Sequence, residues 1–289
     1  MSKDSICLAV GPFNVSLRSN CLSLLDAVDR LYQDYPWASN NEFIDYHINL
    51  IRPSSLRRFY RPQIEFFLDE YSPFLPLSLN EALPLFEWGF NWCIGAHAHQ
   101  YLIIHAAVLA KQGRGLILPG EPGSGKSTLC AALAFSGWQL LSDELTLIDL
   151  VTGRIQPVVR PISLKNESID IITSCYPQAK VGSYVEGTAK GSVAHIQAPA
   201  CSINRMHALA DPSVILLPKY CPQTELDIES LDKSQAFMRV AENSFNYSIL
   251  GEKGFVAVGD LVEQVECYRV QYNKLDNIIE FIEQLFDQP

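Results

Sequence analysis

One segment constrains the fold of this chain more than any other. Residues 115–137 read GLILPGEPGSGKSTLCAALAFSG, which is an apolar run, a glycine-rich loop and a helix-forming segment in succession. The loop, from Gly120 to Ser127, fits G-x-x-x-x-G-K-[ST] at every fixed position. Because this motif binds phosphate when it joins a strand to a helix, the segment predicts a layered α/β domain around a nucleotide site.

The residue types of the loop suit Mg-ATP. Glycines let the backbone curl so that successive N–H groups point at the phosphates, and the following helix adds its partial positive charge. Lys126 can reach the β- and γ-phosphates, and the Ser127 hydroxyl can join the Mg²⁺ shell. The predicted nucleotide-binding residues of the loop are Gly120, Glu121, Pro122, Gly123, Ser124, Gly125, Lys126, Ser127 and Thr128.

Two adjacent acids follow the loop and favour phosphoryl transfer. Asp143 and Glu144 lie where a strand of the same sheet would end beside the phosphates. In such a pair, one acid can take the proton from an attacking hydroxyl and the other can help to hold Mg²⁺. A solvated acidic turn would be the preferred interpretation if no phosphate loop were nearby.

Residues 101–150 resemble the catalytic core of HPr kinase/phosphorylase, a bacterial kinase that acts on a serine of the phosphocarrier HPr. In that family an apolar strand carries a histidine, a second strand leads to the phosphate loop, and a glycine-containing stretch leads to two acids. This chain has His105 in IIHAAVL, then GEPGSGKST, then GWQLLSDE, in the same order and spacing. The resemblance implies Asp143 as the base, His105 as the nearby histidine, and Glu144 as a metal ligand with Ser127.

Other parts of the chain depart from that family. No long glycine-rich signature segment follows the acid pair, and the N-terminal third differs from that of HPr kinases. The chain looks more like the divergent HprK-related kinases (HprK-related kinase A and the lasso-peptide-precursor kinases) of bacterial modification gene clusters. This resemblance implies a hydroxyl acceptor, either a peptide or protein serine or a small alcohol. It also implies a PqqD-like small protein as a partner, and a homo-oligomer, because HPr kinases self-associate.

Two later segments resemble the divergent group more weakly. Arg160 and Lys165, in RPISLK, place two cations after the acidic strand, where they could neutralise transferring phosphoryl oxygens. Lys190 and His195, in GTAKGSVAH, lie in a polar, glycine-bearing segment that could approach the acceptor or the γ-phosphate. The alternatives are a surface ion pair for the first segment and an ordinary turn for the second.

The remaining pattern predicts two domains. Residues 1–94 read as a small α+β domain, with a helix from Asn20 to Tyr35, alternating residues over 43–51 and a helix from Leu79 to Gln100. Residues 95–289 read as the P-loop kinase domain, with a mixed sheet flanked by helices and a final amphipathic helix from Leu275 to Phe286.

Charge and cysteine content exclude several classes of protein. A net charge of −10 and a pI of about 5.1 disfavour nucleic-acid binding. The eight cysteines are scattered and form no CxxC pair, which suits a reducing cytosol. Neither a secretion signal nor a long uncharged apolar run is found, so we expect a cytoplasmic protein that does not span a membrane.

Two alternatives to a kinase stay open. One is an ATP-binding regulatory or peptide-chaperone module that binds nucleotide without phosphoryl transfer. The other is a GTP switch, because residues 273–276 fit NKxD. The GTPase motif DxxG is missing, since Asp149 and Gly153 have one residue too many between them. We therefore interpret Asp276 as a helix-start residue. His97 and His99 lack a nearby third ligand for zinc.

Overall fold

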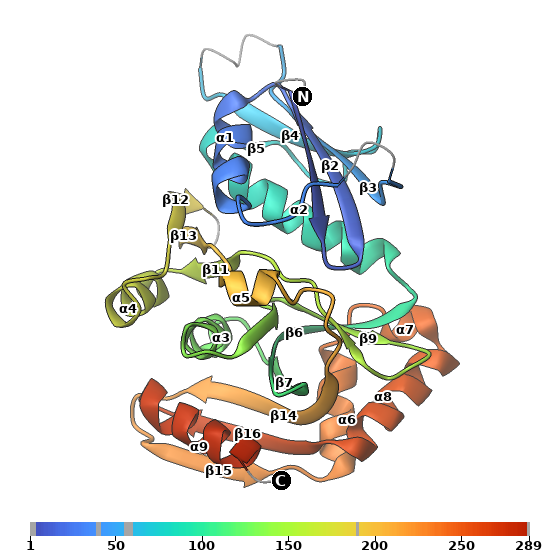
Figure 1. Ribbon diagram of the computed structural model, residues 1–289, viewed down its shortest axis with the longest axis vertical. Helices are drawn as coiled ribbons and strands as arrows, with labels where there is room; N and C mark the ends of the chain where they lie inside the picture. Colours follow the sequence, from blue (N-terminus) through green and yellow to red (C-terminus); the bar gives the residue numbers. More distant parts are fainter. Residues whose placement is uncertain (1–3, 39–41, 55–59, 189–190, 288–289) are drawn as a thin grey trace.

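The computed structural model describes residues 4–38, 42–54, 60–188 and 191–287 (Figure 1). It is a mixed α/β structure with three sheets. The N-terminal sheet has five strands in the order β1-β2-β3-β4-β5 and is covered by helices α1 and α2. Its elements are β1 (Ser5–Val10), β2 (Phe13–Ser19), α1 (Leu22–Leu31), β3 (Tyr46–Ile51), β4 (Gln63–Leu68), β5 (Leu77–Ser78), a 3-10 turn (Leu79–Glu81) and α2 (Ala82–His97).

Both N-terminal helices were predicted, but α1 is shorter than expected at each end. It begins at Leu22 and ends at Leu31, with Leu24, Leu25 and Val28 among its buried residues. Asn20 does not cap this helix. Its side chain instead accepts from the Arg52 N–H at 2.7 Å and donates to the Arg52 carbonyl at 3.1 Å. Asn20 therefore ties the end of β2 to the chain that leaves β3.

The second sheet has eight strands and carries the predicted phosphate loop. Its order is β10-β9-β6-β7-β14-β16-β15, and β8 also pairs with β6. The pairs β14·β16 and β14·β7 are parallel and the others are antiparallel, so the sheet is mixed, as predicted. Its strands are β6 (Tyr101–Lys111), β7 (Arg114–Pro119), β8 (Gln139–Ser142), β9 (Leu145–Asp149), β10 (Ile155–Gln156), β14 (Asp211–Tyr220), β15 (Leu226–Ser230) and β16 (Glu266–Tyr272).

Helices cover both faces of this sheet. Alternate residues of β6 point to opposite faces, so that Ile103 and Ala107 join one apolar cluster while Leu102 and Ile104 join the other. Helices α3 (Lys126–Phe135) and α9 (Leu275–Asp287) belong to the first cluster. Helices α6 (Lys233–Glu242), α7 (Tyr247–Leu250) and α8 (Glu252–Gln264) belong to the second.

A small third sheet, in the order β11-β13-β12, lies between the other two (Figure 1). Its elements are β11 (Ile162–Lys165), α4 (Glu167–Cys175), β12 (Val181–Thr188) and β13 (Gly191–Ile196), and the short helix α5 (Ala200–Ile203) follows. The segment that we expected to be a polar loop is therefore a β-hairpin. Gly187 and Gly191 take positive φ angles of 71° and 86° at its turn, and Lys190 lies outside the described residues.

One apolar core connects the N-terminal sheet to the phosphate-loop helix. Its buried residues run from Leu8 and Phe86 in the N-terminal region to Leu129 on α3 and Ile282 on α9. The predicted domain boundary at residues 94 and 95 falls inside α2, and the division into two domains stays a prediction. Within the described residues, no helix is both long and apolar enough to cross a bilayer.

Candidate active site

The predicted phosphate loop joins β7 to α3. Gly123 and Gly125 have φ angles of 85° and 93°, a backbone conformation that favours glycine. A Cβ on Gly120 would lie 2.9 Å from the Ser124 Oγ, so the Ser124 side chain occupies that space. The Tyr220 N–H donates to the Ser124 carbonyl at 3.0 Å. The loop is therefore curled by its glycines and anchored to the end of β14.

Lys126 is the first residue of α3 and is buried at the base of the loop. Its Nζ donates to the Gly120 carbonyl at 2.5 Å. Burial lowers the pKa of Lys126, the Glu144 carboxylate opposes this, and Lys165 and Asp143 have smaller effects of opposite sign. These four charged side chains therefore lie within electrostatic reach of one another.

The sheet brings His105 and the acid pair to the start of the loop. Strands β6 and β7 pair as far as Ala106 and Pro119, so His105 lies beside Gly120, one position beyond the last pair. On its other edge, His105 pairs with Leu145, which directly follows the acids, and the Ala106 N–H donates to the Glu144 carbonyl at 3.1 Å. His105 on β6 therefore lies between the start of the phosphate loop and the acid pair.

His105 lies on the strand position that faces α3, with Ile103 and Ala107 on the same side. Its backbone N–H donates to the Asn243 carbonyl at 2.7 Å, and its ring lies 5.4 Å from the ring of Phe245. Its role toward a phosphate or an acceptor stays a prediction.

Asp143 is buried, with 6% of its surface exposed. Its Oδ2 accepts a hydrogen bond from the Ser163 N–H at 2.8 Å. Burial, and after it the neighbouring Glu144 carboxylate, raise the pKa of Asp143 to about 7, although the Ser163 N–H and Arg160 oppose this rise. A carboxyl that titrates near neutral pH can accept a proton from a hydroxyl and release it again.

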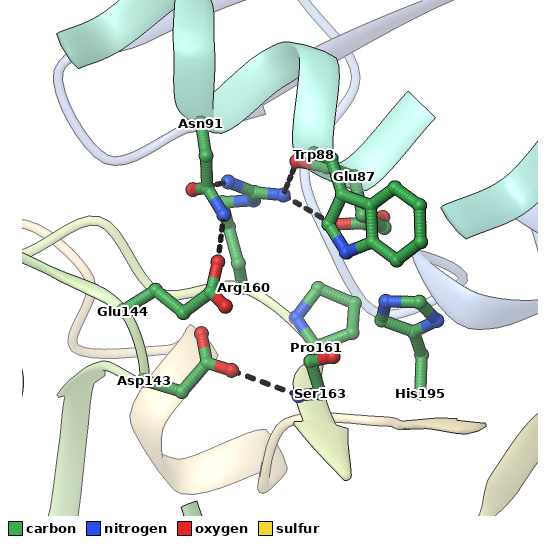
Figure 2. A pocket seen from close by; sticks show the side chains of 9 residues that line it. All are labelled: Glu87, Trp88, Asn91, Asp143, Glu144, Arg160, Pro161, Ser163 and His195. Carbon is green, nitrogen blue, oxygen red and sulfur yellow. Dashed lines mark hydrogen bonds and ion pairs between the residues drawn. The ribbon is translucent and has the colours of Figure 1, made fainter. Parts of the chain in front are cut away.

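Glu144 accepts a hydrogen bond from the side-chain amide of Asn91, which comes from helix α2 (Figure 2). The Asn91 carbonyl oxygen accepts in turn from Arg160, and Arg160 forms a buried ion pair with Glu87. One terminal nitrogen of Arg160 also donates to the Glu87 carbonyl at 2.8 Å. The Arg160 guanidinium therefore points toward α2. A contact between Arg160 and a phosphate stays a prediction.

Lys165 ends β11, and the effect of its charge on the pKa of Lys126 places it near the loop. Its own contact with a phosphate is likewise a prediction. His195 lies opposite Ser163 in the β11·β13 pairing and is buried. Burial lowers the pKa of His195, so its ring is neutral at pH 7.

A small cavity lies between the acid pair, Arg160 and His195 (Figure 2). Its volume is about 10 Å³, which is close to the space that one water molecule needs. The Ser163 Oγ and both ring nitrogens of His195 have no hydrogen-bond partner among the described residues. The cavity has room for one water, which can bond to only one of the two ring nitrogens because they point in different directions. The cavity is lined by Glu87, Trp88, Asn91, Asp143, Glu144, Arg160, Pro161, Ser163 and His195.

The site also contains residues that the sequence analysis did not identify, namely Glu87 and Asn91 on α2 and Ser163 on β11. A signal for the first two was present. They lie four residues apart, and therefore on one face, in the otherwise apolar helix ALPLFEWGFNWCIGAH. A buried Glu in such a helix needs a cationic partner, and here that partner is Arg160.

The oxygen donors near the loop fit Mg²⁺. The Ser127 hydroxyl lies in the first turn of α3, and Glu144 supplies a carboxylate. The described residues contain no cluster of three or more His, Cys, Asp or Glu side chains that could hold a metal ion. Mg²⁺ does not require one, because it keeps several waters and binds through one or two carboxylates together with substrate phosphates.

No family of known proteins and no curated protein matches the sequence. Among solved structures, the chain is similar to the Hpr(Ser) kinase/phosphatase from Coxiella burnetii. The two are 14% identical with a TM-score of 0.29, and the match covers 64% of this chain and 87% of that chain. A similarity of this size assigns neither the activity nor the substrate.

Proposed function

We propose that this protein is a Mg-dependent kinase that transfers the γ-phosphate of ATP to a hydroxyl acceptor. The acceptor is a serine of a peptide or protein, or a small alcohol. The observation that carries the proposal is the position of Asp143. Its carboxyl has a pKa of about 7 and is within electrostatic reach of Lys126 at the base of a P-loop.

In this proposal the loop binds and orients the triphosphate. The N–H groups from Gly120 to Thr128 surround the phosphates, and Lys126 exchanges its bond to the Gly120 carbonyl for one to the β- and γ-phosphates. Ser127 and Glu144 would hold Mg²⁺, which would supply positive charge to neutralise the phosphate oxygens. Arg160 and Lys165 add positive charge to this region of the site.

The transfer step needs one proton acceptor. The acceptor hydroxyl gives its proton to Asp143 as its oxygen bonds to the γ-phosphorus. The bond from that phosphorus to the β–γ bridging oxygen breaks, and ADP leaves with the electron pair. His105, beside Gly120, contacts the acceptor or adjusts the base. We extend the proposal to a PqqD-like partner that presents the acceptor, and to self-association of the chain.

A transfer assay tests this function. ATP carrying labelled γ-phosphate is incubated with the protein, Mg²⁺ and a bacterial cell extract, and the label is followed in each product. A kinase places the label on an acceptor, whereas a nucleotide switch releases labelled inorganic phosphate and prefers GTP. Nucleotide-dependent binding of a protein partner, with all label left in ATP, would overturn the kinase and favour the regulatory module.

A further inference from the structure

Helix α2 contributes a side chain to the acid pair, although it belongs to the N-terminal region. The Asn91 Nδ2 donates to Glu144 Oε2, and the Asn91 Oδ1 accepts from Arg160 (Figure 2). A guanidinium group donates hydrogen bonds and cannot accept them. Arg160 therefore fixes which end of the Asn91 amide faces Glu144, and that end is the N–H donor.

Three contacts with α2 hold Arg160 in place. It forms an ion pair with Glu87, donates to the Glu87 carbonyl at 2.8 Å and lies 4.6 Å from the centre of the Phe90 ring. The hydroxyl of Tyr32, which directly follows α1, donates to Glu87 Oε1 at 2.9 Å. Arg160 and Glu87 are only 4% and 2% exposed. The Arg160 Nε has no hydrogen-bond partner among the described residues, but both terminal nitrogens of Arg160 are paired. These pairings give the amide of Asn91 one preferred position.

We propose that Asn91 is a positioning residue that holds the Glu144 carboxylate toward the Mg²⁺ position beside Ser127. The N-terminal region thereby supplies part of the catalytic centre. The inference rests on the proposed function. The amide hydrogen occupies Oε2, while no hydrogen bond joins Oε1 to the described residues. Oε1 would then be left to bind the metal, as when a second residue orients a metal ligand.

The Mg²⁺ dependence of nucleotide binding tests this role. A non-hydrolysable ATP analogue is titrated into the protein over a range of Mg²⁺ concentrations, which gives the half-saturating Mg²⁺ concentration. We expect Asn91→Leu to raise that concentration about tenfold, the usual effect of losing a residue that orients a metal ligand. Asn49→Leu is the control, because the Asn49 amide donates to the Asp69 carbonyl at 3.2 Å, away from the acid pair.

A double variant separates a positioning role from a general loss of structure. If Asn91 acts through Glu144, Asn91→Leu should have no further effect on Mg²⁺ dependence once Glu144→Gln is present. Fold-changes that multiply in the double variant, or an Asn91→Leu protein with the wild-type Mg²⁺ dependence, would overturn the inference.

Urea unfolding without nucleotide tests the contact itself and does not depend on the proposed function. The shift in the unfolding midpoint for the double variant should differ from the sum of the two single shifts, because contacting residues are coupled. Additive shifts would contradict the contact and the inference with it. A wild-type protein whose nucleotide binding ignores Mg²⁺ would overturn the proposed function instead, and the unfolding measurement would still decide the contact.

Discussion

Burial makes Asp143 suited to accept a proton near neutral pH, but it also makes the ionised carboxylate less stable in the folded protein. The pKa of its carboxyl, about 7, lies above the ordinary value of 3.8, mainly because the group is buried. The folded protein therefore binds this proton more tightly than the unfolded chain does. Between about pH 4 and pH 7, the contribution of Asp143 to the free energy of unfolding falls as the pH rises.

The substitution Asp143→Asn should therefore stabilise the protein at alkaline pH. The Asn side chain keeps an oxygen that can accept the Ser163 N–H but carries no charge. We expect a gain in the free energy of unfolding of up to about 4 kcal/mol at pH 8, and no gain at pH 4. Urea unfolding at the two pH values measures it.

Asp149→Asn is the control of opposite sign. Burial acts to raise the pKa of Asp149, but hydrogen bonds from Thr152 and Val151 outweigh it and lower the pKa. This variant should lose stability at pH 8. A loss of the same size for Asp143→Asn at both pH values would contradict the account of Asp143.

Lys126→Ala should weaken nucleotide binding, because it removes the charge expected to reach the β- and γ-phosphates. We expect the dissociation constant of Mg-ATP to rise at least tenfold, or about 1.4 kcal/mol, in a calorimetric titration. Lys253→Ala on α8 is the control, because Lys253 is exposed. Equal affinities for both variants would argue against the loop as the nucleotide site.

The sequence identifies the residues of the site that are close together in the chain. The loop is recognisable because the motif fixes residue types at fixed spacings, and the acid pair because it follows the loop at the end of an expected strand. Asn91 and Glu87 are part of the site only because α2 packs against the chain at Arg160, which follows β10. The two polar residues in an otherwise apolar helix signal that they need a partner, but no local pattern identifies Arg160 as that partner.

At the scale of elements, the start of α3 depends on Gly125. Its φ angle is 93°, and a Cβ there would lie 2.6 Å from the Tyr272 hydroxyl. We expect Gly125→Ala to lower both the free energy of unfolding and the affinity for Mg-ATP, because the loop must shift to avoid β16.

Gly137→Ala is the matched control for this prediction. Gly137 has a φ angle of 105°, and a Cβ there would meet no atom within 4 Å. It should cost about 1–2 kcal/mol of stability through backbone strain alone and leave nucleotide affinity unchanged. Denaturation and titration of both variants distinguish the two cases. Equal affinities in the two variants would contradict the close approach of Tyr272 to the loop.

Elements with a strong hydrophobic period are predicted well, and others are not. The helix at 275–287 agrees with the sequence analysis within one residue, and Asp276 lies in its first turn. The apolar segment IIHAAVL lies in a strand, as the resemblance implies. Helices α6 to α8 were not predicted. A signal for α6 was present, because Asp232 and Gln235 form a capping box at its start.

At the scale of the whole molecule, a buried ion pair joins the N-terminal region to the region that carries the predicted phosphate loop. Arg160→Leu should lower the free energy of unfolding by about 3–5 kcal/mol, because it leaves the buried Glu87 without its partner. Arg154→Leu is the control. The ion pair of Arg154 with Asp211 is exposed, so its loss should cost about 1 kcal/mol or less. Similar losses for the two variants in urea unfolding would contradict this role of the buried pair.

The most direct test of the kinase measures nucleotide affinity and label transfer on the same preparations of wild type and Asp143→Asn. The account predicts similar Mg-ATP affinities, because the phosphate loop is intact in both proteins, and a labelled acceptor with the wild type only. Full transfer by Asp143→Asn would contradict the assignment of Asp143 as the base. A wild-type protein that binds Mg-ATP and transfers no label to any acceptor would contradict the kinase itself.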